Sequence, residues 1–184
     1  MTSPSSYLLF IVFSFVFLPT HARNIVHGTC KLCSQQDPNV RYRFCTTSLE
    51  AASGSHHANI RGLGKISIHL IHENLTDTRS HIKKLMKNNV FKLNAFVKPR
   101  LDDCLELYSD SIIDIRSAMK NYKLKRYDEA SLLISAVMDA ATTCENGFKE
   151  KRKAISPLTK RNNVTFELAA IGLSLIRVIQ SGIN

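Results

Sequence analysis

The sequence predicts an all-α protein, an up-down-up-down four-helix bundle that follows two short helices. Three observations lead to this fold. Four long segments repeat apolar residues at steps of three and four, which is the spacing of one face of a packed helix. Cys104 and Cys144 lie at equal distances on either side of Leu124, so a chain folded back at Leu124 brings the two thiols level. Strand signals are almost absent, which leaves helices to build the core.

The N-terminus has the pattern of a secretory signal peptide. Residues 8–18 form an 11-residue apolar run, followed by Pro19 and the small-residue pattern Thr20-His21-Ala22. This run is too short to cross about 30 Å of hydrocarbon as a helix. We therefore expect residues 1–22 to be removed on secretion, no later membrane span, and a mature protein that does not associate with membranes. Residues 23–184 then suit one domain in two parts, 23–57 and 58–184.

The first part holds two short helical candidates within residues 24–52, broken at Pro38. It also holds Cys30, Cys33 and Cys45, and secretion allows disulfides to form. Cys30 and Cys33 have CxxC spacing, but no βαβ pattern surrounds them, so a redox motif is not expected. A local loop closed by Cys45 fits better, and spacing barely separates Cys30 from Cys33 as its partner.

The first and last bundle helices are expected at residues 59–87 and 163–181. The first follows the polar joint 53–57, and Gly62 and Gly64 weaken its start. The last follows a Ser-Pro break and ends before a glycine. The expected buried positions are Gly64, Ile68, Ile71, Leu75, Thr78, Ile82 and Leu85 in the first, and Val164, Leu168, Ile171, Leu175 and Val178 in the last.

The two middle helices are expected to form the stapled pair. The earlier one begins after Pro99, and residues 123–126 turn it into the later one. Their inward positions are Cys104, Tyr108, Ile112, Ile115, Met119 and Tyr122 before the turn, and Tyr127, Ala130, Ile134, Val137, Ala141, Cys144 and Phe148 after it. Each disulfide is expected to constrain the unfolded chain by about 3 to 4 kcal/mol.

Residues that could carry catalysis are scarce. No GxSxG, HExxH or glycine-rich phosphate loop occurs, and the adjacent pair Asp102-Asp103 fits an early helical turn. His69 and His72, with Glu73 adjacent and His81 further along, approach a zinc pattern. A zinc site would need a third ligand and an organised second shell, so we interpret these histidines as solvated or rim side chains. We expect no enzymatic activity, no metal and no cofactor.

The mature surface is basic, since 25 Lys and Arg against 15 Asp and Glu give a net charge of +10, none of it in residues 1–22. Two clusters flank the bundle links and are expected at one end of the bundle: Lys83, Lys84, Lys87, Lys92, Lys98 and Arg100, and Lys149, Lys151, Arg152, Lys153, Lys160 and Arg161. Secretion favours a polyanionic polysaccharide such as acidic pectin, or an acidic protein patch, as partner, rather than nucleic acid. A solvated basic surface without a partner is the second interpretation. Histidine protonation should tighten such binding as pH falls.

Two sequons, at Asn74 and Asn163, are compatible with secretion and predict N-glycosylation. Asn74 falls inside a predicted helix. Asn163 has a second interpretation, as the cap of the last bundle helix.

Several stretches resemble the plant invertase and pectin methylesterase inhibitor family. They are Gly28-Thr29-Cys30, the Pro-Asn turn of residues 34–40, Tyr42 to Cys45, Arg61 to Gly64, residues 144–151 and residues 156–160. The resemblance covers nearly the whole mature chain. It implies a four-helix bundle preceded by a short N-terminal helical hairpin, with disulfides Cys30 to Cys45 and Cys104 to Cys144. Cys33 has no counterpart and becomes the free thiol, either buried or exposed and prone to intermolecular pairing.

The resemblance also implies a function: stoichiometric complexes with cell-wall pectin methylesterase or acid invertase, in the apoplast, that block substrate access without catalysis. Invertase inhibitors of the family carry Pro-Lys-Phe at the middle turn, where this chain has Lys125-Arg126-Tyr127. The cation and the ring remain, and the Cys104 to Cys144 bridge would brace this turn. Because the proline is lost, pectin methylesterase is the expected target and invertase the alternative. Tyr127 has a second interpretation, as the start of the core stripe. The alternative of another class is a non-inhibitory basic bundle that binds pectate or serves as a stored or allergenic pollen protein.

Overall fold

A computed structural model of the protein describes residues 20–88, 95–150 and 155–182, and of residues 20–24 the backbone alone. Within these ranges every regular element is a helix, which confirms the all-α prediction. The elements are α1 (Thr20–Gln36), α2 (Tyr42–Ala51), the 3-10 turn η1 (Ser55–His57), α3 (Ile60–Lys87), α4 (Val97–Lys123), α5 (Tyr127–Lys149) and α6 (Thr159–Gln180). Residues 1–19, most of the predicted signal peptide, lie outside the described residues.

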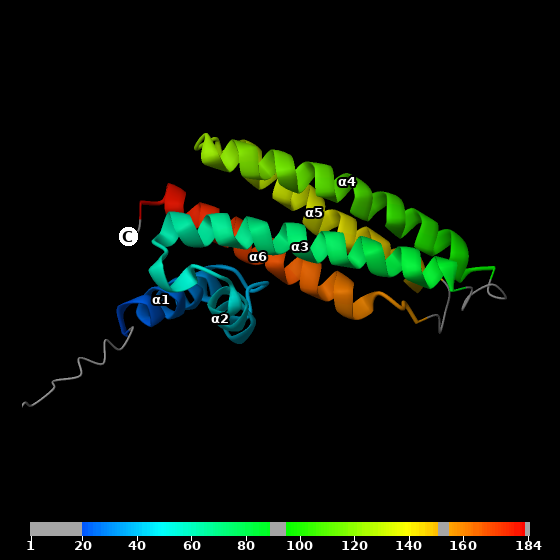
Figure 1. Cartoon of the computed structure of the whole chain (residues 1–184), viewed down its shortest axis with the longest axis horizontal. Helices are drawn as coiled ribbons and strands as arrows, with labels where there is room; N and C mark the ends of the chain where they lie inside the picture. The colour runs from blue at the N-terminus through cyan, green and yellow to red at the C-terminus, as the bar shows by residue number, and fades with distance from the viewer. Residues whose placement is uncertain (1–19, 89–94, 151–154, 183–184) are drawn as a thin grey trace, which may run out of the picture.

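Helices α3 to α6 form the four-helix bundle (Figure 1). Each packs against the next along the chain, and α3 also packs against α6, which closes the ring. Short links between long helices favour this antiparallel order. The bundle end formed by the α4–α5 turn lies opposite the end where α3 and α5 end and α4 and α6 begin (Figure 1).

The hairpin of α1 and α2 covers one side of the bundle near the start of α3 (Figure 1). Pro38 lies in the turn between the two helices, where the Asp37 carboxylate accepts the Asn39 N–H at 2.9 Å. The Cys30–Cys45 disulfide joins the helices across a Cα separation of 5.7 Å. The pairing is the one that the family resemblance implies.

Helix α6 is buried on more than one face. Besides most of the predicted stripe, its buried positions include Ala169, Ala170, Gly172, Ser174 and Ile176. The bundle covers one side of α6, and the hairpin core packs on Ile171, Leu175 and Val178. By length and composition α6 is also apolar enough to cross a membrane, contrary to the expectation that no segment after the signal peptide has these properties. Most of its apolar stretch, however, is buried inside the protein. Its apolar character is therefore that of a core helix between two layers.

Two helix starts differ from the predictions. Helix α4 begins at Val97, so Pro99 lies in its first turn rather than before it; a proline is tolerated there because first-turn N–H groups have no intrahelical acceptor. Helix α6 begins at Thr159, four residues before the predicted start. Asn163 is therefore inside α6, and its interpretation as a cap is wrong.

The predicted inward positions of α3, α4 and α5 are buried, with Leu85, Met119 and Tyr127 only partly so. Disulfide Cys104–Cys144 joins α4 and α5 with a Cα separation of 5.0 Å. Folding the chain back at Leu124 therefore brings the two cysteines level, as their symmetric spacing predicts.

Candidate functional site: the α4–α5 turn

The turn between α4 and α5 has a defined hydrogen-bonded geometry. Lys125 adopts a left-handed conformation, with φ +59°, and is the sole non-glycine residue in the described ranges with positive φ. Its N–H donates to the Tyr122 carbonyl at 3.0 Å, and the N–H of Arg126 donates to the Asn121 carbonyl at 2.9 Å. These two bonds form a Schellman motif, in which the residue at the left-handed position is usually glycine. Here that position is occupied by a lysine.

The three residues singled out from the sequence differ in exposure. Lys125 and Arg126 are exposed, and neither makes an ion pair within the described part of the chain. Tyr127 is half-buried and packs edge-on against Tyr122, with ring centroids 5.4 Å apart. The turn therefore presents two cations to solvent, while its aromatic ring belongs to the bundle core. An apolar side chain accompanies the cations, since Leu124 is 55% exposed.

Contacts near the turn hold it in place. The amide of Gln180, at the end of α6, donates to the Asp128 carboxylate at 2.7 Å. The Tyr122 hydroxyl donates to the Arg61 carbonyl at 2.8 Å, which ties the end of α4 to the start of α3. The Cys104–Cys144 bridge is remote, because Cys104 precedes Leu124 by 20 residues, or about 30 Å of helix. The turn is thus supported chiefly by local packing.

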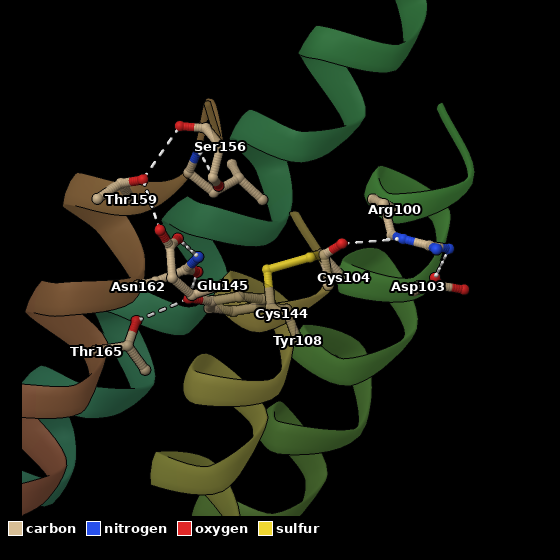
Figure 2. The surroundings of a disulfide bond; sticks show 12 residues. Arg100, Asp103, Cys104, Tyr108, Cys144, Glu145, Ser156, Thr159, Asn162 and Thr165 are labelled. Atoms are coloured by element: carbon tan, nitrogen blue, oxygen red, sulfur yellow. Dashed lines mark hydrogen bonds and ion pairs between the residues drawn. A yellow bond between two sulfur atoms is a disulfide. The ribbon is translucent and has the colours of Figure 1, made fainter. Parts of the chain in front are cut away.

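A polar network surrounds the disulfide instead (Figure 2). Glu145 of α5 accepts hydrogen bonds from Thr159 and from the Asn162 side chain of α6, each at 2.8 Å. Tyr108 of α4 donates to the Asn162 side-chain oxygen at 2.8 Å and lies 3.1 Å from the Thr165 hydroxyl. Burial raises the pKa of Tyr108 to about 12, so this phenol stays protonated. The network anchors the start of α6 to α4 and α5.

A groove of about 590 Å³ runs between α4 and α5 beside the disulfide. Its charged lining residues are Arg100, Asp103, Glu106, Asp110 and Glu150. Arg100 crosses the groove, where its Nε donates to the Gly147 carbonyl at 3.1 Å and its Nη2 to Glu150 at 2.5 Å. This acidic groove lies away from the turn cations.

Basic residues gather at the bundle end opposite the α4–α5 turn, but several of them form ion pairs. Arg161 binds Asp77, and the hydrogen bond from Arg161 lowers the pKa of that carboxyl. Lys98 contacts Asp102 at 3.2 Å. The described residues without an ion pair there are Lys83, Lys84, Lys87, Lys149 and Lys160. The remaining members of the predicted clusters, Lys92, Lys151, Arg152 and Lys153, lie outside the described residues.

Cys33 is fully buried, within the core that joins the hairpin to α6. Burial raises the pKa of this thiol to about 11. Because the thiolate is the reactive form, Cys33 is unsuited to intermolecular pairing.

The two sequons are linked through one hydroxyl. Asn74 of α3 accepts a hydrogen bond from Thr165, the third residue of the Asn163 sequon, at 2.6 Å. Asn163 itself is exposed, whereas Asn74 is half-buried. The two expected glycosylation sites therefore lie in different surroundings.

Two of the three histidines of α3, His69 and His72, have partners within the bundle. His69 contacts Glu73 at 3.2 Å, and His72 accepts a hydrogen bond from Arg116 at 3.3 Å. The described residues contain no group of three His, Cys, Asp or Glu side chains that could hold a metal ion. Sequence reasoning missed Arg116 because it lies on another helix and belongs to no motif.

Fold and turn together define a class of protein: a disulfide-stapled helical bundle with an exposed cationic turn and charged faces. Residues 24–175 match the family described as plant invertase/pectin methylesterase inhibitor, and the chain belongs to that family. Members of the family are enzyme inhibitors rather than enzymes.

Relatives carry names of both kinds. The chain is 38% identical over 156 residues to a protein of Platanus acerifolia named "Putative invertase inhibitor", covering 85% of this chain and 86% of that one. It is 27% identical over 159 residues to "Pectinesterase inhibitor 12" of Arabidopsis thaliana, covering 86% and 89%. In fold it resembles the crystal structure of a mutant form of an Arabidopsis pectin methylesterase inhibitor, with a TM-score of 0.68 at 20% identity, over 81% of this chain and 95% of that chain.

Proposed function

We propose that this protein is a secreted inhibitor of pectin methylesterase that acts by forming a stoichiometric complex with the enzyme in the plant cell wall. Family membership supports the inhibitory activity. Two disulfides support an oxidising, extracytoplasmic compartment. The cleaved signal peptide, residues 1–22, is part of the same proposal.

The backbone conformation of Lys125 is the observation that supports pectin methylesterase, rather than invertase, as the target. The family resemblance associates invertase inhibition with a proline at this position. A proline cannot adopt φ +59°, because its ring holds φ near −65°, and it has no N–H to donate to the Tyr122 carbonyl. The turn of this chain is therefore built on a different backbone, which supports a target other than invertase.

Acid invertase is the second candidate, and two observations favour it. The 38% identical relative is named for invertase inhibition. Lys125 and Arg126 also remain exposed and unpaired within the described residues, so Arg126 is free to reach an acidic active-site carboxylate. Tyr127 would contribute less, since it packs on Tyr122.

The experiment is a titration of the oxidised protein into a plant pectin methylesterase assay and a plant acid invertase assay, both at mildly acidic pH. Saturable inhibition of pectin methylesterase near one-to-one stoichiometry is expected. Inhibition of invertase alone would replace the target with the second candidate. No inhibition in either assay, together with salt-sensitive binding to pectate, would favour a non-inhibitory basic protein of the cell wall or pollen.

A charge reversal tests the turn. If the turn inserts into an invertase active site, Arg126→Glu should abolish invertase inhibition. The matched control is Lys31→Glu, which reverses an exposed charge on α1. An unchanged inhibition constant for Arg126→Glu would reject the insertion of this turn.

A further inference from the structure

A groove of about 230 Å³ lies at the surface of the seam between α3 and α4. One part of its lining is apolar and consists of Ile68, Ile115 and Met119. The other part is rich in nitrogen and consists of His69, His72 and Arg116. Each part draws residues from both helices, so the groove is built into the framework of the bundle.

The hydrogen bond between Arg116 and His72 defines the resting state of the groove. The Nε–H of Arg116 donates to Nε2 of His72 at 3.3 Å. Arginine has no acceptor and stays protonated, so Nε2 must be the unprotonated ring nitrogen. His72 is therefore neutral in this arrangement, with its proton on Nδ1.

The charged groups facing His72 come from both helices. Arg116 faces it from α4, and His69 and Glu73 face it from α3. Burial lowers the pKa of His72, Arg116 and His69 lower it further, and Glu73 alone opposes them. Glu73 contacts His69 at 3.2 Å, while Arg116 makes no ion pair within the described residues. The lining of the groove therefore contains one permanent cation, Arg116, and no carboxylate.

Protonation of His72 changes the hydrogen-bonding requirement of the groove. When His72 gains a proton on Nε2, two N–H donors face each other, and the hydrogen bond from Arg116 is lost. An acceptor placed between them would satisfy both, and an anion would also offset the added charge. We propose that this groove is a binding site for a carboxylate on a short aliphatic chain, held between Arg116 and protonated His72 and bound together with one proton.

The apolar lining selects the aliphatic chain. Branched aliphatic side chains and a thioether bury hydrocarbon well but offer no partners to the hydroxyl groups of a sugar. Ile68 and Ile115 are at most 1% exposed, so Met119 supplies the partly exposed apolar surface of the lining, and it offers no hydrogen-bond partner to the hydroxyls of a uronic acid. A branched aliphatic acid such as isovalerate fits both parts of the lining. The inference does not depend on which enzyme the protein inhibits.

The test is an NMR titration of the histidine ring signals of the whole protein with isovalerate. Saturable binding is expected, at least about tenfold tighter near pH 5 than near pH 7.5, with a rise in the apparent pKa of His72 at ligand saturation. Isovaleramide, the neutral isostere, should not bind, and galacturonate should bind more weakly. Equal responses to isovalerate and isovaleramide, a tighter response to galacturonate, or no saturable response near pH 5 would each overturn the proposal.

Variants separate this site from general attraction to a basic protein. Arg116→Gln should weaken isovalerate binding at least about tenfold near pH 5. His72→Gln should remove its pH dependence. Lys120→Gln is the matched control, because it removes an exposed charge one turn further along α4 without touching the groove. An equal loss with Lys120→Gln and Arg116→Gln would show that net charge alone attracts the ligand, and would overturn the site. Thermal unfolding of each variant confirms that the bundle is retained.

Discussion

The hydroxyl of Tyr122 lies against the α-carbon of Gly64, at the point where α4 ends beside the start of α3. A β-carbon added at Gly64 would lie 2.9 Å from the Cζ atom of Tyr122 and closer still to its hydroxyl oxygen. Tyr122 has little freedom to move, because it is 6% exposed and its hydroxyl donates to the Arg61 carbonyl. The same tyrosine receives Tyr127 on its ring, so Gly64 helps to position the turn residues.

Gly64→Ala is therefore expected to destabilise the protein, although replacing a helical glycine with alanine usually stabilises a helix by up to about 1 kcal/mol. Overpacking against Tyr122 should cost about 1 to 3 kcal/mol. Gly28→Ala in α1 is the control, since nothing lies within 4 Å of its added β-carbon, and it should be neutral or stabilising. Denaturant unfolding measures both. Matching gains for the two variants would contradict the close contact.

The left-handed Lys125 leads to opposite expectations for two substitutions. Lys125→Gly should stabilise the protein by about 1 kcal/mol, because glycine adopts positive φ without steric cost. Lys125→Pro should destabilise it by about 3 kcal/mol, since it removes the N–H donated to the Tyr122 carbonyl and cannot reach φ +59°. Thermal and denaturant unfolding measure the change in stability of each variant and therefore its sign. A proline variant as stable as the parent would mean that the turn has another geometry.

The helices could be predicted from the sequence because burial in a bundle imposes a period on each of them. Ile134, Val137 and Cys144 follow that period, and all three are buried. The symmetry of Cys104 and Cys144 about Leu124 likewise depends only on helix rise and an antiparallel return, which are constant from protein to protein.

What could not be predicted depends on contacts between elements distant in sequence. Gly64 reads as a weak point of a helix until Tyr122 is placed against it. The sequence does not indicate positive φ at Lys125, because glycine and asparagine are the residues that usually occupy such positions. Burial of α6 on several faces follows from the hairpin docking beside it, which the period of α6 alone does not reveal.

The stability of the folded protein should fall as pH drops below about 6.5, the ordinary pKa of histidine. The folded protein lowers the pKa of His72 through burial and Arg116, and that of His81 through burial and Arg161. Between the folded and unfolded pKa values the unfolded chain binds more protons, so unfolding is favoured as pH decreases through that window. Melting temperatures measured from pH 7.5 to pH 5 should show this slope.

Histidine substitutions identify the source of the slope. The double variant His72→Gln and His81→Gln should flatten the dependence of melting temperature on pH in this window. His56→Gln is the control, because His56 is exposed and lies on η1, whereas His72 and His81 lie on α3. A slope unaltered in the double variant would assign the effect to other groups.

The two disulfides should contribute unequally to stability. The Cys104–Cys144 bridge closes 40 residues and Cys30–Cys45 closes 15. On the loop-entropy account, replacing the longer bridge by alanines should cost about 4 kcal/mol and the shorter about 3 kcal/mol. Equilibrium unfolding in denaturant compares them. Cys33→Ala is the control, since it removes a buried thiol but no crosslink.

Loss of the Cys104–Cys144 bridge should leave the turn in place. Because the bridge lies about 30 Å of helix from Leu124, the contact between the Tyr122 and Tyr127 rings should persist in the Cys104→Ala and Cys144→Ala double variant. Ring-to-ring nuclear Overhauser effects measure this contact in the folded state. Its disappearance, at a temperature where the variant remains folded, would mean that the disulfide positions the turn through the whole length of α4 and α5. Its persistence would assign that positioning to Tyr122, Gly64 and the hydrogen bonds around Lys125.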